Sequence, residues 1–154
     1  MQMNTTKNRR YRGGDMTTKE YLMQLRTIDF DILNVQSESD SWRELAMKMG
    51  HEYSDIHVDT SPSPDRMESL IVKAVDCATK ADREKEILIY LKATIERQIK
   101  SIEDKECVYV LWGYYHDRLT IDYIAKKLNY SPRQGKRMKK KAERMFENKY
   151  GSSF

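Results

Sequence analysis

The stretch Leu119–Phe146 reads LTIDYIAKKLNYSPRQGKRMKKKAERMF, and its pattern predicts two short helices joined by a tight turn. Thr120 can cap the first helix, because a threonine oxygen in that position accepts a backbone N–H that would otherwise have no partner. The apolar residues at helical spacing behind this cap are Ile121, Ile124, Ala125 and Leu128. Asn129 and Tyr130 are predicted to form the turn.

A second helix is predicted to begin at Pro132. Proline has no backbone N–H, and in the first turn of a helix that N–H would have no partner in any case. Ser131 supplies the capping oxygen, and Gln134 completes a capping box three residues later. The narrow apolar seam of this helix comprises Met138, Ala142 and Met145. A basic second helix that crosses a first helix at the small Ala125 is typical of a helix-turn-helix. The alternative is a solvated basic helix that closes a bundle.

In a helix-turn-helix the N-terminal part of the second helix reads base edges in the major groove. The residues predicted to contact bases are Arg133, Gln134, Lys136 and Arg137. Arginine suits guanine and glutamine suits adenine, each through paired hydrogen bonds. The residues predicted to contact the DNA backbone are Ser131, Lys126, Lys127, Lys139, Lys140, Lys141 and Arg144. Gly135 is expected to lie within the base-reading face and to cost about 1 kcal/mol of helix stability relative to alanine.

Charge is distributed unevenly along the 154 residues, although the formal net charge is only +4. Residues 118–154 carry eleven Lys or Arg and three acidic residues, and residues 1–15 carry four basic residues and one acidic. Residues 16–117 carry thirteen basic and twenty acidic residues. A basic terminal module on an acidic body predicts double-stranded DNA as the partner of that module.

The pattern L-T-x-x-x-I-A-x-x-L-x-x-S from Leu119 to Ser131, followed by a basic helix, resembles region 4 of bacterial sigma factors. The wider chain, from about Met16 to Tyr150, resembles the sigma-region-4-like transcriptional regulators of phages of Gram-positive bacteria, of the ArpU/RinA type. The further segments that carry this resemblance are Lys19–Arg26, Asp65–Asp76 and Ile102–Glu106. The chain departs from the pattern at Gly135, where sigma factors carry an apolar residue, and at Ser61–Pro64.

The resemblance implies an all-α fold with a sigma-region-4-like DNA-binding domain. It also implies a regulator that acts in the cytoplasm of a bacterial host and activates late phage genes. Host RNA polymerase is a further partner that the resemblance suggests.

Two long helices are predicted before this module, one from Thr17 to about Met49 and one from about Asp65 to Ile102. Each carries apolar residues at alternating steps of three and four, with polar exceptions at Ser39, Glu84 and Gln98. Gly50 is expected to end the first helix, and a loop is predicted at about 50–64. The serine-rich cluster 37–41 is a candidate interruption. The pattern predicts an antiparallel helical hairpin, and the alternative is a homodimer in which the stripes of two copies pair.

Asp104 is predicted to cap a third helix, about Lys105 to His116, which is apolar on most of its circumference and therefore buried. Its aromatic residues are interpreted as core, with a base-stacking surface as the alternative. The predicted organisation is an all-α chain: a disordered basic arm at 1–15, the hairpin at 16–101 and the DNA-binding domain at 102–150.

No apolar run approaches the length that spans a bilayer, so no membrane association is expected. Cys77 and Cys107 form no metal-ligand spacing with the three histidines, which predicts no metal and no cofactor. Because no catalytic motif is found, an enzyme is not expected. The sequence predicts a sequence-specific DNA-binding regulator of phage transcription. The alternatives are a small-terminase-like DNA-packaging protein that forms a ring, or a helical module that binds a protein partner.

Overall fold

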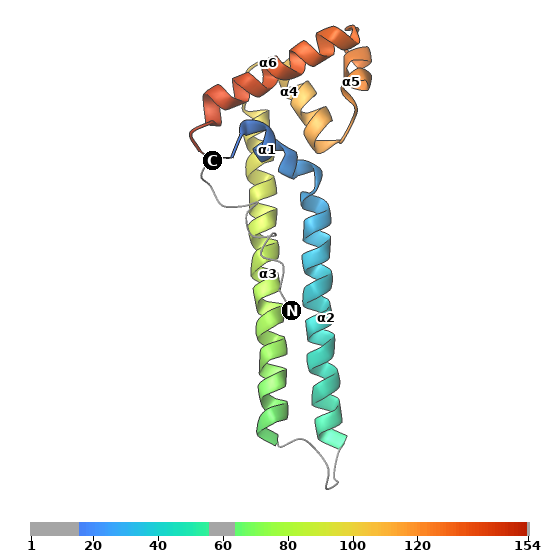
Figure 1. The fold of residues 1–154 in the computed structure, drawn as a ribbon, viewed down its shortest axis with the longest axis vertical. Coiled ribbons are helices and arrows are strands. Elements are labelled where there is room, and N and C mark those ends of the chain that lie inside the picture. The colour runs from blue at the N-terminus through green and yellow to red at the C-terminus, as the bar shows by residue number, and fades with distance from the viewer. Residues whose placement is uncertain (1–15, 56–63, 154) are drawn as a thin grey trace. The chain divides into compact units, whose positions relative to one another are not determined.

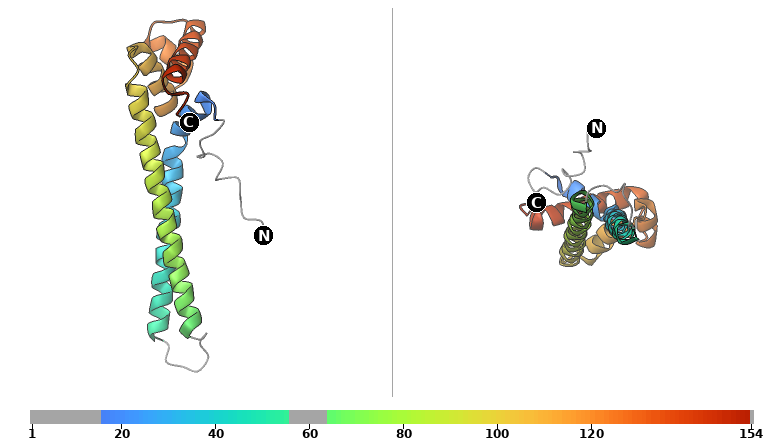
Figure 2. Two further views of the ribbon diagram at one scale, coloured as in Figure 1. Left: turned by 90° about the vertical axis from the view of Figure 1, so that its left-hand side faces the viewer. Right: turned by 90° about the horizontal axis from the view of Figure 1, so that it is seen from below.

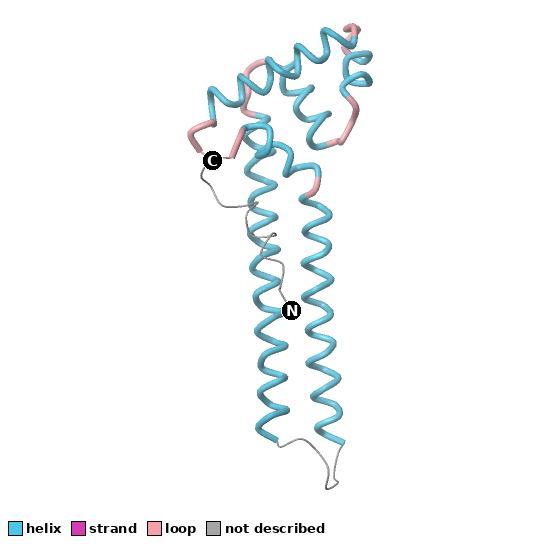
Figure 3. Tube along the Cα trace, in the orientation of Figure 1, coloured by secondary structure: helices cyan, strands magenta, loops and turns pink. Residues whose placement is uncertain are grey.

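The structure is a computed structural model that describes residues 16–55 and 64–153, and every regular element in these ranges is helical (Figures 1 and 3). The elements are α1 (Thr18–Met23), η2 (Gln24–Arg26), α2 (Ile28–Asp55), α3 (Pro64–Lys100), α4 (Lys105–Leu111), η3 (Trp112–His116), α5 (Ile121–Lys127) and α6 (Pro132–Tyr150). The predicted all-α class is therefore confirmed. The predicted arm at 1–15 lies outside the described residues.

The described chain divides into two compact units, each treated by itself below. Residues 28–93 form the two-helix unit, and residues 16–27 together with 94–153 form the composite unit. This division differs from the predicted boundary near residue 101, since α1, η2 and the last turns of α3 belong with α4, α5 and α6. The composite unit therefore draws on both ends of the sequence.

The first predicted helix is interrupted, which corrects the expectation of one helix from Thr17 to Met49. Thr17 does cap α1 through a capping box with Glu20, but η2 follows and the chain leaves helical geometry at Thr27. Leu22 and Leu25 lie before this break and are buried in the composite unit. The apolar spacing continues in the same register across the break, so periodicity alone could not reveal it.

Neither expected interruption of α2 occurs, because the helix runs through residues 37–41 and past Gly50 to Asp55. The Ser41 hydroxyl donates to the Ser37 carbonyl at 2.8 Å, a bond inside one helical turn. Gly50 stays helical, since a glycine lowers helix stability by only about 1 kcal/mol and does not by itself end a helix. Residues 56–63 of the predicted loop lie outside the described ranges.

Within the two-helix unit, α2 and α3 run antiparallel and side by side (Figure 2). Three hydrogen bonds follow this antiparallel order, because the residue numbers rise along α2 while those of their partners fall along α3. They join Asp29 with Lys92 at 2.5 Å, Gln36 with Lys85 at 2.6 Å, and Ser39 with Asp82 at 2.8 Å. The buried apolar residues between the helices are Ile28, Val35, Ala74, Ala78, Ala81 and Leu88. Three alanines on α3 keep that side of the interface small.

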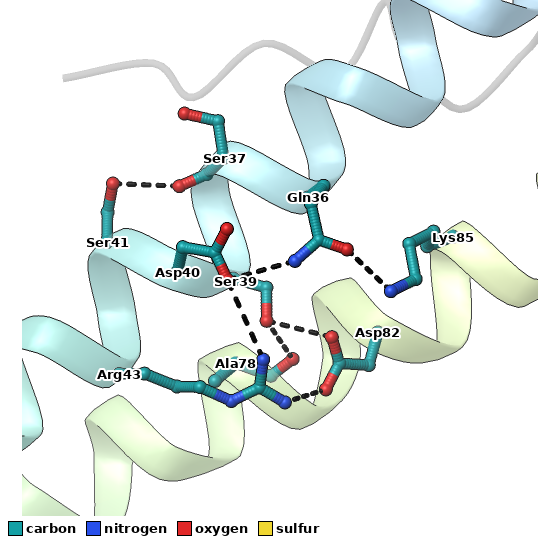
Figure 4. A network of polar contacts seen from close by, with 9 residues as sticks. All are labelled: Gln36, Ser37, Ser39, Asp40, Ser41, Arg43, Ala78, Asp82 and Lys85. Carbon is teal, nitrogen blue, oxygen red and sulfur yellow. Dashed lines mark hydrogen bonds and ion pairs between the residues drawn. The ribbon is translucent and has the colours of Figure 1, made fainter.

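The polar exception at Ser39 is fully buried and lies at the centre of a polar network (Figure 4). Its hydroxyl lies 2.8 Å from the Asp82 carboxylate and 3.5 Å from the Ala78 carbonyl of α3. Arg43 pairs with the same carboxylate of Asp82. Because a buried hydroxyl needs a partner, this network favours one register of α2 against α3.

The core of the composite unit combines side chains from α1, η2, the end of α3 and the C-terminal helices. Its buried apolar residues include Leu22, Leu25, Ile95, Ile99, Val110, Leu111, Tyr115, Ile124 and Phe146. The predicted third helix begins as expected at the Asp104 cap, but it winds into a π-helical turn from Trp112 to His116. Tyr115 in that turn is fully buried, which agrees with the core interpretation, whereas Trp112 and Tyr114 are half-buried and Tyr109 is exposed.

Candidate nucleic-acid interface

The helix starts and the turn around α5 and α6 form as predicted. Thr120 Oγ1 accepts the Tyr123 N–H at 3.3 Å, and Ser131 and Gln134 make a reciprocal capping box with bonds of 3.3 and 2.8 Å. Between the helices Asn129 has a φ of 57°, a left-handed conformation that asparagine tolerates well. The local sequence therefore determines where α6 starts.

Gly135 lies at a close crossing of α6 over α5, which corrects its expected place on the base-reading face. The glycine is buried, and a Cβ built on it would lie 2.6 Å from the Ala125 Cβ. No real side-chain carbon fits at that distance, so only glycine allows this crossing without displacement of one helix. The small Ala125 was predicted at the crossing, and Gly135 is its partner.

The face of α6 opposite this crossing carries a line of positive charge, here called the cation line. Its members recur every three or four residues and are all exposed: Arg133, Arg137, Lys140 and Arg144. The buried residues of the same helix are Gly135, Ala142 and Phe146, which lie on the other side at 100° per residue. Eleven steps along a helix place the ends of the line about 16 Å apart. No hydrogen bond or ion pair to another described residue occupies these four side chains.

The other predicted contact residues differ in whether their side chains already bind another residue of the chain. Lys136 is exposed beside the cation line, and Lys126 and Lys127 are exposed at the end of α5. Gln134 is exposed too, but its side-chain carbonyl accepts the Ser131 N–H. A glutamine needs both its carbonyl and its amide to bind adenine through paired hydrogen bonds, so base contact by Gln134 requires the capping box to open.

Two predicted backbone contacts, Lys139 and Lys141, are held by carboxylates within the composite unit. Lys139 Nζ lies 3.4 Å from Glu143 Oε1 and 3.8 Å from the centre of the Tyr114 ring, and its side chain is only 17% exposed. Lys141 Nζ lies 2.7 Å from Asp104 Oδ2. Lys139 is thus both paired and largely covered, whereas the Lys141 side chain stays 55% exposed and only its ammonium group is engaged by the carboxylate.

The remaining contacts of α6 hold the helix along its length, and the sequence did not reveal them. The Tyr115 hydroxyl donates to Glu143 at 2.5 Å, and burial together with this carboxylate raises the pKa of Tyr115. Near the end of the helix, Lys149 donates to the Ser101 carbonyl at 2.6 Å. Glu143 and Glu147 are the two acidic residues of α6. An acidic residue among so many basic ones was the one signal in the sequence of such an internal contact.

Possible metal ligands, membrane-spanning helices and reactive thiols are the remaining features of the described ranges. No group of three or more His, Cys, Asp or Glu side chains there could hold a metal ion, and no helix in those ranges has the length and apolarity needed to cross a bilayer. Cys107 is fully buried, and burial followed by the Asp104 contact raises the pKa of its thiol to about 11. At neutral pH this thiol is protonated, so it lacks the thiolate needed for nucleophilic attack.

Comparison of the chain with protein-family models, with characterised proteins and with solved structures finds no significant match.

Proposed function

We propose that this chain is a sequence-specific, double-stranded DNA-binding regulator of transcription, without enzymatic activity, in which α5, the turn and α6 act as a helix-turn-helix. One observation carries this proposal: the cation line is exposed, free of internal partners, and directed away from the Gly135 crossing that holds α6 on α5. A basic helix of this kind fits the major groove of B-form DNA, which is about 12 Å wide.

The proposed division of labour follows position along α6. Arg133, Lys136 and Arg137 lie in the first two turns and contact base edges, because the N-terminal part of a recognition helix enters the groove. Lys140 and Arg144 lie further along the same face and neutralise phosphates, as do Lys126 and Lys127 of α5. Paired hydrogen bonds from Arg133 or Arg137 would favour guanine.

The resemblance to sigma region 4 supplies the biological context of the proposal. The regulator acts on phage promoters in the bacterial cytoplasm, activates late genes and contacts host RNA polymerase. The two-helix unit serves as a helical hairpin, and its exposed Phe30, Leu33, Ile87 and Tyr90 are surfaces through which two copies could form a homodimer.

Selection of bound sites from random duplex DNA, followed by alanine variants, tests this proposal. Arg137→Ala should lower affinity for the selected site by about 1–3 kcal/mol and relax the base preference at one position. Lys140→Ala should weaken selected and random duplexes equally and reduce the slope of log affinity against log salt by about 1. Both side chains are exposed, so neither change should alter folding. Equal losses on selected and random DNA for both variants would refute the division of labour.

The same preparation distinguishes the other functions that the sequence allows. A monomer or dimer in size-exclusion chromatography with light scattering favours regulation, whereas a ring of many subunits favours DNA packaging. Failure of the wild-type chain to bind any duplex at low salt would overturn the DNA-binding proposal and favour an acidic protein as the partner of α6.

A further inference from the structure

Asp104 performs two tasks with its two carboxylate oxygens. Oδ1 accepts the backbone N–H groups of Glu106 and Cys107 at 3.0 and 3.1 Å and so caps α4. Oδ2 accepts from Lys141 Nζ at 2.7 Å. The cap needs only Oδ1, so the second contact is separable from the folding of α4. A lysine of the DNA-binding helix is thus held by an acid of a different helix.

Glu143 acts similarly on the other side of α6. It lies 3.4 Å from Lys139 Nζ while it also accepts from the Tyr115 hydroxyl, and the Tyr114 ring covers the same ammonium group. At 100° per residue, Lys139 and Lys141 project to opposite sides of the cation line. Lys139 and Lys141 are therefore paired with carboxylates, whereas the four members of the line and Lys136 beside it have no such partner among the described residues.

We propose that Asp104 and Glu143 are specificity-determining residues: they withhold Lys141 and Lys139 from general phosphate binding and confine the DNA-contacting charge of α6 to the cation line and Lys136. This inference rests on the proposed DNA-binding function. It assigns a role to two acidic residues that lie outside the predicted contact set.

The physical basis is the difference between specific and random complexes. Random duplexes are bound almost entirely through phosphates, and each phosphate neutralised steepens the salt dependence by about 0.9. A random complex can shift along and around the duplex to use any free lysine, whereas a specific complex is held in one orientation by its base contacts. A freed flanking lysine therefore strengthens random binding more than specific binding.

Asp104→Asn is the sharpest test, because asparagine caps helices about as well as aspartate and loses only its charge-assisted contact with Lys141. We expect affinity for a random 30-base-pair duplex to rise about threefold and its salt slope to steepen by about 1. Affinity for the site selected by the wild-type chain should rise less, so that the ratio of specific to random affinity falls.

Two controls separate the release of Lys141 from a mere gain of net charge. Glu147→Gln removes an exposed acid of α6 that makes no ion pair with another described residue, and it should change the specificity ratio less than Asp104→Asn does. In a Lys141→Met background, Asp104→Asn should leave random binding unchanged. An equal effect of Glu147→Gln, or a persistent effect in the Lys141→Met background, would overturn the proposal.

A readout without DNA keeps the two proposals distinguishable. Acylation of Lys141 by a water-soluble ester, followed by mass spectrometry, should proceed faster in Asp104→Asn than in wild type. Unchanged acylation rejects the sequestration itself. Faster acylation with an unchanged specificity ratio rejects only the role in specificity, and absence of duplex binding by the wild-type chain rejects the DNA-binding function together with this inference.

Discussion

At the scale of single residues, Gly135 shows how a sequence pattern can be interpreted in two opposite ways. A glycine in a helix normally costs stability, and its position among basic residues favoured a place on the exposed face. The crossing with Ala125 reverses that interpretation, since the missing side chain is what allows the two helices to approach. The residue therefore lies behind the face that carries the cation line and does not interrupt that face.

Gly135→Ala should destabilise the composite unit, although alanine is the better helix former. The added Cβ would lie 2.6 Å from the Ala125 Cβ, and such overpacking costs about 1–3 kcal/mol. Urea unfolding followed by Trp112 fluorescence, in a Trp42→Phe background, measures this change. Gly50→Ala is the matched control in α2: a Cβ there meets nothing within 4 Å, so the two-helix unit should gain about 0.5–1 kcal/mol by circular dichroism. Stabilisation by both variants would contradict the close crossing.

At the scale of elements, buried or shared polar side chains decide which helix faces meet. The Ser39 hydroxyl of α2 donates a hydrogen bond to the Asp82 carboxylate of α3 and so favours one register of the two helices. This hydrogen bond is the largest cause of the lowered pKa of Asp82. Asp104 similarly links the start of α4 to Lys141 of α6. Neither pairing follows from apolar periodicity, which identifies a buried face but leaves open the residue that it meets.

The Asp104 contacts predict a specific pH dependence of the composite unit. The hydrogen bond from Lys141 and, after it, the Cys107 backbone N–H lower the pKa of Asp104 from 3.8 to about 2. Because the folded pKa lies below the unfolded one, the stabilisation is complete above pH 4 and is lost as the pH falls from about 4 to 2. Thermal unfolding of Asp104→Asn should therefore depend less on pH in this window than that of wild type. Glu147→Gln should retain the wild-type dependence, and a wild-type slope in Asp104→Asn would contradict the assignment.

At the scale of the whole molecule, the composite unit is assembled from two separate stretches of chain. The two-helix unit is inserted between Thr27 and Thr94, and Leu22, Leu25 and Ile99 supply core side chains to the helices that carry the cation line. The predicted domain at 102–150 lacks all three. A fragment cut at that boundary would expose the apolar surface that they cover.

Two truncations test this organisation. A fragment of residues 102–153 should lack cooperative thermal unfolding by circular dichroism, because it loses the core side chains of α1, η2 and α3. A chain in which residues 16–27 are joined to 94–153 by a short Gly/Ser linker should unfold cooperatively. The linker has little distance to span, since Asp29 and Lys92, each one residue inside an end of the excised segment 28–93, bond through their side chains at 2.5 Å. Cooperative folding of the 102–153 fragment would contradict the composite unit.

The amino-acid sequence by itself determined those features that depend on neighbours along the chain. The all-α class, the caps at Thr120, Ser131 and Asp104, and the turn at Asn129 were all predictable, because cap and turn signals act over three or four residues. The basic character of α6 was predictable for the same reason.

Only the tertiary structure decided which of those residues are free to act. The break at Thr27, the crossing at Gly135 and the capture of Lys139 and Lys141 by acids all depend on segments that meet in space. Helical periodicity predicts on which face of a helix a residue lies, but not which residue it contacts. A lysine that pairs with a carboxylate therefore cannot be distinguished from an unpaired lysine in the sequence. The cation line of α6 therefore became visible only once the internal contacts of its neighbours were known.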